Sequence, residues 1–264
     1  MVSVKPAEGT LGPVFSPQGP SLRELCVQAL SSVERGYDHL APKFDHTPFR
    51  TPDGVLEATV QALSAAGPFD RGLDVCCGTG AGLTLLGRVC RQRVTGVDFS
   101  AGMLVKAHDA VPGATLVRAD ARALPFTEGF DLAVTFGALG HFLPSERPAL
   151  FDGVHRALRP GGLFAVGLGE LPSRNNRAYW LSLGFDLAML VRNAVVLPSF
   201  VMYYRTAPAV AVRRDLRAAG FTVESVDLPA GDEDDLRFSL VLARKPAGPA
   251  WRPRPRRSPA RSGS

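Results

Sequence analysis

A glycine-rich segment at 72–82 is the part of the sequence best suited to holding a ligand. It reads Gly72-Leu-Asp-Val-Cys-Cys-Gly-Thr-Gly-Ala-Gly82, which is an apolar strand followed by a turn and the start of a helix. Glycine allows positive φ angles and lets a ligand approach the backbone, and a helix N-terminus favours anionic groups. Taken alone, the segment is equally typical of a dinucleotide site or of a tight structural turn.

Two carboxylates follow the next two predicted strands. Asp98 lies 18 residues after Gly80 and can accept hydrogen bonds from both ribose hydroxyls of an adenosine. Asp120 lies in the loop 118–126, which is suited to reading the adenine edge. Separately they could be a helix cap and a turn former. Together, three loops at successive strand ends predict one crevice that binds a nucleoside.

Alternating strands and helices must position these loops. Apolar runs predict strands at 72–76, 94–98, 115–118, 131–136 and 163–168. Helical patterns lie between them at 82–91, 101–110 and 146–158. This order predicts an α/β fold with a parallel sheet and helices on both faces.

The C-terminal part of the fold breaks this alternation. Thr206 and Pro208 open a predicted helix that stops at Gly220, and strands are predicted at 221–228 and 236–243. The seven residues between these strands are too few for a crossover helix. The last pair of strands is therefore predicted to be antiparallel.

The segments outside this core divide into four predicted regions. Residues 1–19 are rich in Pro and Gly and are expected to be flexible, and 20–67 form an N-terminal helical cap. Within that cap, a capping box at Ser21 starts a helix with apolar spacing as far as Val33, and a second helix runs from Thr51 to Gly67. The stretch 171–205, which is rich in apolar residues, is predicted to be a lid inserted in the domain 68–245, and 246–264 a disordered tail of Pro, Arg and Ser.

Charge and cysteine content limit the classes of partner. Six of the chain's 30 basic residues lie in 245–264, which has no acidic residue, so 24 basic residues face 25 acidic ones elsewhere. A nearly neutral body argues against a nucleic-acid partner. The four cysteines form no C-x-x-C pair, and no disulfide framework or metal site is expected. Without a signal-peptide pattern or an uninterrupted apolar span, we expect a cytoplasmic protein with no stable membrane anchor.

The order of motifs resembles the class I S-adenosylmethionine-dependent methyltransferases, especially small-molecule enzymes that act on quinone rings and natural products. The matching segments are LDVCCGTGAG (73–82), VTGVDFSAGML (94–104), VRADARALPF (117–126), FDLAVTFGALGHF (130–142) and LRPGGLFAVG (158–167). The resemblance implies S-adenosyl-L-methionine as the cofactor. It also implies a Rossmann-like sheet of seven strands whose last strand is antiparallel.

For the methionine part of the cofactor, the resemblance implies contacts from Asp74, Gly78 and Gly80. It places Phe136 and Gly137, at the end of the fourth strand, along the cofactor near the reacting methyl group. All five residues occupy matching positions in the motifs.

For the adenosine part, the resemblance implies that Asp98 holds the ribose. Phe99 and Met103 are expected to pack against the adenine ring. Asp120 and Ala121 are expected to face its amino group and a ring nitrogen. These residues also match the family's motifs position by position.

The resemblance extends to the cap segment 37–45, which reads Tyr37-Asp-His-Leu-Ala-Pro-Lys-Phe44-Asp45. A similar aromatic–Asp pattern precedes the fold in these enzymes and helps to close the cofactor pocket. Phe44 replaces a tyrosine that is usual there, so a hydroxyl is absent from that position.

The expected reaction is methyl transfer to a small, lipophilic or aromatic acceptor, such as a quinone, polyketide, phenol or fatty-acyl compound. His141 is the candidate general base if the acceptor must lose a proton, and Tyr37, Tyr203 and Tyr204 are weaker candidates. Three alternatives remain open: a non-catalytic S-adenosylmethionine-binding protein, a nicotinamide-dependent oxidoreductase and a nucleic-acid methyltransferase. The last would be expected to carry Asn/Asp-Pro-Pro-Tyr where this chain has Thr135-Phe-Gly-Ala.

Overall fold

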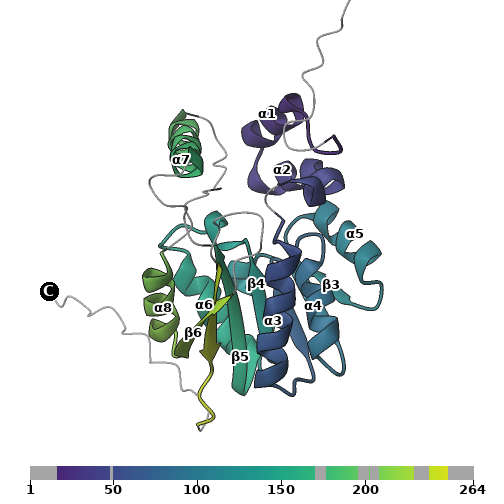
Figure 1. The fold of residues 1–264 in the computed structure, drawn as a ribbon, viewed down its shortest axis with the longest axis vertical. Coiled ribbons are helices and arrows are strands. Elements are labelled where there is room, and N and C mark those ends of the chain that lie inside the picture. The colour runs from purple at the N-terminus through teal and green to yellow at the C-terminus, as the bar shows by residue number, and fades with distance from the viewer. Residues whose placement is uncertain are drawn as a thin grey trace, which may run out of the picture.

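A central sheet organises the molecule (Figure 1). The computed structural model describes residues 17–47, 50–169, 177–195, 202, 208–228 and 238–248. In this described part, seven strands form one sheet in the order β3-β2-β1-β4-β5-β7-β6. They are β1 (Gly72–Val75), β2 (Val94–Asp98), β3 (Thr115–Arg118), β4 (Phe130–Phe136), β5 (Leu158–Gly169), β6 (Thr222–Leu228) and β7 (Phe238–Arg244).

The direction of the strands confirms the predicted topology. Strands β1 to β5 pair in parallel, whereas β7 lies antiparallel between β5 and β6. The β5–β7 register runs from Leu163 opposite Arg244 to Gly169 opposite Phe238. The short connection between β6 and β7 therefore reverses the chain, as a loop without a crossover helix must.

Helices cover both faces of the sheet, as the alternating pattern predicts. On one face, α3 (Asp53–Ala66), α4 (Ala81–Val89) and α5 (Ala101–Ala110) pack against Leu132 and Val134. On the other, α6 (Arg147–Ala157) and α8 (Ala209–Ala218) pack against residues that include Leu73, Ala133 and Phe164. Neighbouring residues of a strand point to opposite faces, so β4 contributes to both cores.

The N-terminal cap differs from the prediction of one helix reaching Val33. The chain forms α1 (Leu22–Leu30), α2 (Val33–Leu40) and a 3-10 helix, η1 (Ala41–His46). The predicted capping box at Ser21 is present. The break follows because the Ser31 hydroxyl donates to the Val27 carbonyl, 2.6 Å away, and the Ser32 hydroxyl caps α2 by accepting from the Arg35 amide. The first helix therefore ends before Val33, because the hydroxyls of Ser31 and Ser32 bond to backbone groups at the junction.

Strand β5 also begins earlier than predicted. The sequence places its start at 163, but the strand extends from Leu158 because Leu158 pairs with Phe130 before a register shift. Gly161 adopts a φ of 80°, which accommodates the irregular stretch.

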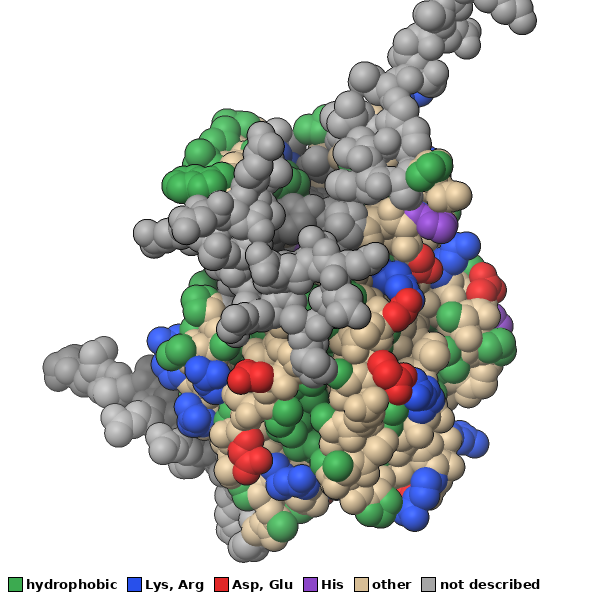
Figure 2. All heavy atoms as spheres, viewed as in Figure 1, with side chains coloured by type: hydrophobic (Ala, Val, Ile, Leu, Met, Phe, Trp, Pro, Cys, Tyr) green, Lys and Arg blue, Asp and Glu red, His purple; other side chains and the backbone are tan. Residues whose placement is uncertain are grey.

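Helix α7 (Arg177–Val195) lies in the segment predicted to be a lid. Figure 1 shows it beyond the edge of the sheet, near the N-terminal helices. Arg192 Nη2 on α7 donates to the Ser31 carbonyl at 3.0 Å, which ties α7 to the cap. Hydrophobic side chains gather on α7 in Figure 2, and its exposed large apolar residues are Trp180, Leu187, Leu190, Val191 and Val195.

Several predicted features lie outside the described residues. These are most of the N-terminal stretch 1–19, most of the tail 246–264 and the parts of 171–205 that flank α7, except Met202. Tyr203 and Tyr204 are among them. None of the helices that the structure does describe is both long and apolar enough to cross a membrane.

Candidate active site

A cavity of about 790 Å³ opens where the parallel strands end at their carboxyl termini. That volume is typical of small-molecule sites. Its strand-end half is formed by residues that end or follow β1 to β4: Cys76, Gly78, Asp98, Phe99, Ala119, Asp120, Phe136 and Gly137. Its cap half is formed by the described N-terminal cap (17–47), which contributes Ser32, Val33, Glu34, Tyr37 and Phe44.

Nine of the eleven predicted site residues line this cavity. They are Gly78, Asp98, Phe99, Met103, Asp120, Ala121, Phe136, Gly137 and His141. The other two, Asp74 and Gly80, do not line it. The structure therefore brings residues from five separate segments together, as the strand-end argument requires.

The glycine-rich turn uses its two central glycines differently. Gly78 (φ 51°) has open space where a side chain would lie, so its backbone faces the cavity. Gly80 (φ 99°) ends the turn at the start of α4, and a Cβ there would lie 3.2 Å from the Cα of Ala107 on α5. Gly80 thus allows close packing of α4 and α5, and its predicted contact with the cofactor has no support from its position.

Asp74 lies beneath the turn instead of facing the cavity. Its side chain is 2 % exposed, and its Oδ2 is buried with no hydrogen-bond partner among the described residues. Asp74 alternates with Leu73 and Val75 along β1, so it points toward α4, where Gly82 leaves room for it. Burial, together with the charge of Asp98, raises the pKa of Asp74 to about 8.

Asp98 combines burial with access to the cavity. Its Oδ2 accepts from the Gly78 amide and its Oδ1 from the Ser100 amide, both at 2.9 Å. Burial raises the pKa of Asp98, and these backbone bonds oppose that change. A carboxylate offers about four lone-pair sites. Asp98 can therefore hold the turn in place and still accept two further hydrogen bonds from a ligand.

Asp120 is more exposed and is engaged by its neighbour. Its Oδ1 accepts from the Arg122 amide at 2.8 Å, and its Oδ2 lies 2.6 Å from Arg122 Nη2. This ion pair lowers the pKa of Asp120. The carboxylate stabilises the turn that begins η2 (Ala121–Ala123). If Asp120 contacts adenine as predicted, its carboxylate must accept from adenine and from Arg122 at the same time.

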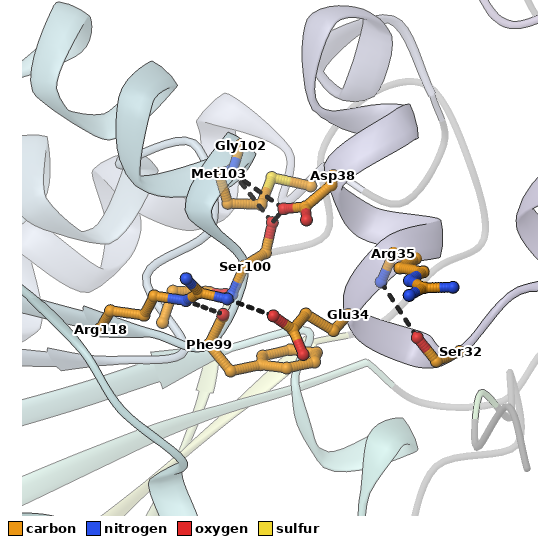
Figure 3. A network of polar contacts seen from close by, with 10 residues as sticks. Ser32, Glu34, Arg35, Asp38, Phe99, Ser100, Gly102, Met103 and Arg118 are labelled. Carbon is orange, nitrogen blue, oxygen red and sulfur yellow. Dashed lines mark hydrogen bonds and ion pairs between the residues drawn. The ribbon is translucent and has the colours of Figure 1, made fainter. Parts of the chain in front are cut away.

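Side chains of the cap bind the loops of the strand-end half (Figure 3). Asp38 Oδ1 accepts from the Ser100 hydroxyl at 2.6 Å and from the Gly102 amide at 2.9 Å. Glu34, one helical turn earlier, pairs with Arg118 at the end of β3. Glu34 and Asp38 share one face of α2 because they are four residues apart. The spacing of the two carboxylates is visible in the sequence, but their partners in the strand-end loops depend on the tertiary structure.

Two more contacts complete the attachment of the cap and the closing of the cavity. The Asp45 carboxylate accepts from the Thr79 hydroxyl at 2.7 Å, which joins η1 to the glycine-rich turn. Away from the cap, Arg122 and Glu146, which both line the cavity, form an ion pair. The prediction that the segment 37–45 helps to close the pocket agrees with this geometry.

His141 meets a residue of the cap inside the cavity. It lies in η3 (Leu139–His141) after β4, and its Nε2 is 2.8 Å from the Tyr37 hydroxyl. Their rings make an edge contact with centroids 5.2 Å apart. The hydroxyl also lies 3.8 Å from Met202 Sδ, and Phe44 has its ring centroid 6.2 Å from that of Tyr37. The surroundings of this polar pair are largely apolar.

Comparison with known proteins finds methyltransferases that are similar to part of this chain. Residues 73–162 match the family described as a methyltransferase domain. A methyltransferase of Synechocystis sp. whose activity is not characterised is 38% identical over 126 residues, which is 47% of this chain and 58% of that protein. The 2-phytyl-1,4-naphtoquinone methyltransferase of Synechococcus elongatus is 31% identical over 54% of this chain and 65% of its own length.

A third relative is the phthiotriol/phenolphthiotriol dimycocerosates methyltransferase of Mycobacterium tuberculosis, 39% identical over 41% of this chain and 40% of its length. The chain thus spans less than two thirds of these relatives. Among solved structures, the PH0226 protein of Pyrococcus horikoshii aligns with 75% of this chain and 94% of its own at a TM-score of 0.54 and 22% identity. That likeness concerns the fold.

Proposed function

We propose that this protein transfers a methyl group from S-adenosylmethionine to a small, lipophilic or aromatic acceptor. The proposal starts from residues 73–162, which match a methyltransferase domain. The observation that carries this proposal is the placement of Asp98. Its buried carboxylate keeps hydrogen-bonding capacity toward a cavity that also contains His141.

The residues of the strand-end half fit an adenosyl cofactor. Asp98 is suited to the two ribose hydroxyls, and the open backbone at Gly78 leaves room for the amino-acid part. Phe99 and Met103 offer apolar surface for the adenine ring, and Ala121 also lines the cavity. The roles of Phe136 and Gly137 beside the methyl group rest on their position at the end of β4.

S-adenosylmethionine supplies a methyl group on a positively charged sulfur. The neutral thioether is the leaving group, and it needs no proton from the protein. The chain's own residues then have to orient the acceptor and exclude water, and orientation can contribute several kcal/mol, on the order of 7 or more in favourable cases. Tyr37, Phe44 and Phe142 give the cavity apolar walls for this purpose. His141 is available to accept a proton if the acceptor must lose one.

The nature of the acceptor is inferred from the walls and from the relatives. Met202, which belongs to the predicted lid, is 8 % exposed and lines the cavity. The names of two relatives specify a naphthoquinone and a phenolphthiotriol as methyl acceptors of those proteins. An apolar wall and relatives that act on lipophilic molecules both favour a lipophilic or aromatic acceptor. A reducing compartment remains part of the proposal, supported by the free thiols of Cys76, Cys77 and Cys90.

Isothermal titration with S-adenosylhomocysteine and with NADH tests the cofactor. We expect binding of S-adenosylhomocysteine and none of NADH; the reverse result would favour the oxidoreductase alternative. A screen with labelled S-adenosylmethionine over quinones, phenols, fatty acids and amines then tests turnover. Binding of the cofactor without transfer to any of these compounds would favour a non-catalytic binding protein.

A further inference from the structure

Helix α7 directs its charged side chains inward and its apolar ones outward. Asp186 and Arg192, the two charged residues among its described side chains, are only 8 % and 9 % exposed. On the opposite side of the helix, Leu187, Val191 and Val195 are 60 %, 59 % and 76 % exposed. A helix that packs on a protein in water normally shows the reverse pattern. The outward side of α7 is therefore suited to an apolar environment.

Helix α1 extends this apolar surface. Arg192 Nη2 on α7 donates at 3.0 Å to the carbonyl of Ser31, the residue that follows α1, so the two helices meet there. Figure 1 shows both helices at the same end of the molecule, and hydrophobic side chains gather at that end in Figure 2. Exposed apolar patches mark sites of contact with proteins or membranes. The exposed apolar residues of the two helices, named here the apolar end face, are Val27, Leu30, Leu187, Leu190, Val191 and Val195.

Two arginines of the cap carry unpaired positive charge. Arg23 lies on the same side of α1 as Val27 and Leu30, because it precedes them by four and seven residues. Arg35 is exposed on α2, and its side chain points away from Phe99 in Figure 3. Neither arginine forms an ion pair with any residue that the structure describes. Both are available to an anionic partner.

The acidic side chains of the described cap (17–47) are engaged elsewhere. Glu34, Asp38 and Asp45 bind the strand-end half. Glu24 pairs with Lys43. The outer surface of the cap therefore presents positive charge next to apolar side chains.

We propose that the apolar end face docks reversibly on an anionic lipid surface. Apolar side chains beside arginines are typical of helices that lie in the interface of a bilayer, where the apolar groups enter the lipid and the arginines stay at the headgroups. Such docking needs no helix that spans the membrane. A second copy of this chain is a poorer partner, because a two-fold contact would place the unpaired arginines of both copies in one interface.

Docking through this face would bring the cavity close to molecules dissolved in the lipid. Val33 and Tyr37 of α2 line the cavity, and so does Met202 of the predicted lid. The cap and the lid thus contribute both to the cavity and to the docking face. A lipophilic acceptor collects in bilayers, so the protein would meet it at the lipid surface. This consequence rests on the proposed function, whereas the docking itself does not.

The first test measures co-sedimentation with vesicles of phosphatidylcholine and phosphatidylglycerol in equal parts. The wild type should bind these vesicles. The α7 variant, Leu187→Glu with Val191→Glu, should bind at least about ten-fold more weakly, because carboxylates replace apolar groups that enter the lipid. Its matched control, Val105→Glu with Val210→Glu, places the same charges on similarly exposed sites of α5 and α8. The control should bind at least about five-fold more tightly than the α7 variant.

The second test concerns the charges. Arg23→Gln with Arg35→Gln should weaken binding about ten-fold, because each arginine near an anionic surface adds to the attraction. Vesicles of phosphatidylcholine alone, and high salt, should weaken the binding of the wild type by a similar factor. Arg93→Gln with Arg217→Gln removes the same charge from exposed sites outside the cap and should change binding less than about three-fold.

Two results would refute the docking outright. They are a wild type that does not bind the mixed vesicles and an α7 variant that binds them as tightly as the wild type. Two others would replace the lipid surface by a different occupant. Dimers of the wild type in light scattering that the α7 variant does not form would identify a second copy. A free energy of unfolding that is lower for the α7 variant than for its control would identify another segment of this chain.

Binding of the cofactor product separates the docking from the proposed function. Affinity for S-adenosylhomocysteine should be unchanged in every variant, because none of the substituted residues lines the cavity. A wild type that binds the mixed vesicles but not S-adenosylhomocysteine would confirm the docking and reject the proposed function.

Discussion

The two halves of the cavity are built by different means. In the strand-end half, backbone amides of nearby loops hold Asp98, and the register of parallel strands sets the position of each loop. In the cap half, side chains such as Asp38 and Tyr37 reach across 62 and 104 residues of sequence to their partners. The first half is part of the sheet, whereas the second is attached to it by a few polar contacts. Substitutions should therefore affect cofactor affinity or folding in the first half, and closure or turnover in the second.

The largest effect is expected from Asp98→Ala. The variant loses the two hydrogen bonds that we propose between Asp98 and the ribose, for which about 1.5–3 kcal/mol each is expected because the acceptor is charged, and it also loses the bond to the Gly78 amide. Affinity for S-adenosylhomocysteine should fall at least about 100-fold, which is close to 3 kcal/mol, in a calorimetric titration. Asp109→Ala, an exposed substitution on the same side of the sheet that does not line the cavity, is the control. Asp109→Ala should leave the affinity unchanged, and an equally small effect of Asp98→Ala would mean that Asp98 does not hold the nucleoside.

Gly82→Ala should produce the next largest effect, on folding. The new Cβ would lie 2.5 Å from Asp74 Oδ2, so the carboxylate, which is only 2 % exposed, would have to shift. We expect a loss of about 1–3 kcal/mol in the free energy of unfolding measured with urea. Gly87→Ala in the same helix meets nothing within 4 Å and should gain up to about 1 kcal/mol. Equal stability of the two variants would show that Asp74 does not lie under α4.

The stability of the cofactor-free protein should depend on pH through Asp74. Its pKa is about 8 when folded, against an ordinary value of 3.8, so the folded state binds an extra proton between these values. The free energy of unfolding should therefore fall as the pH rises from 4 to 8, with a slope on the order of 1 kcal/mol per pH unit from this group. Asp74→Asn should remove that part of the slope. Identical slopes for both proteins in urea titrations at several pH values would contradict the buried, protonated state.

Asp38→Asn should loosen the cap with a smaller effect. The variant replaces a carboxylate by a neutral amide, which weakens the bonds to the Ser100 hydroxyl and the Gly102 amide by about 1 kcal/mol each. We expect dissociation of S-adenosylhomocysteine to be several-fold faster in stopped-flow measurements and the cap to be cut sooner by protease. His39→Ala, the exposed neighbour, should leave both rates unchanged. A dissociation rate equal to that of the wild type would mean that cap attachment and cofactor retention are independent.

Glu34→Gln should give the smallest effect. Its ion pair with Arg118 has side chains that are 43% and 57% exposed, and exposed pairs contribute about 0–1 kcal/mol. Cofactor affinity should change less than about five-fold, and the difference should shrink as salt is raised. A larger, salt-independent loss in titrations would show that Glu34 contacts the ligand directly.

The strand-end half could be predicted from the sequence because its information is local. Strand–turn–helix patterns fix where each strand ends, and a carboxylate at that end, such as Asp98, must lie at the common edge. The burial of Asp74 could also be predicted from the sequence, because the alternation of side chains along β1 places Asp74 on the face opposite Leu73 and Val75. The contact of Asp74 with the methionine part of the cofactor, which the family resemblance implies, stays a prediction.

The cap half could be predicted only in part because its contacts depend on tertiary structure. The aromatic–Asp pattern at 37–45 indicated closure, but the pairing of Tyr37 with His141 depends on where α2 comes to rest. The break between α1 and α2 depends on two serine side chains that compete with the backbone, which apolar spacing does not report.

A crystal structure of the protein with S-adenosylhomocysteine tests the central claim most directly. It should show the nucleoside in the cavity, both ribose hydroxyls within hydrogen-bonding distance of the Asp98 carboxylate, and the sulfur directed toward the space beside Tyr37 and His141. A nucleoside bound elsewhere, or one whose ribose makes no contact with Asp98, would contradict the account.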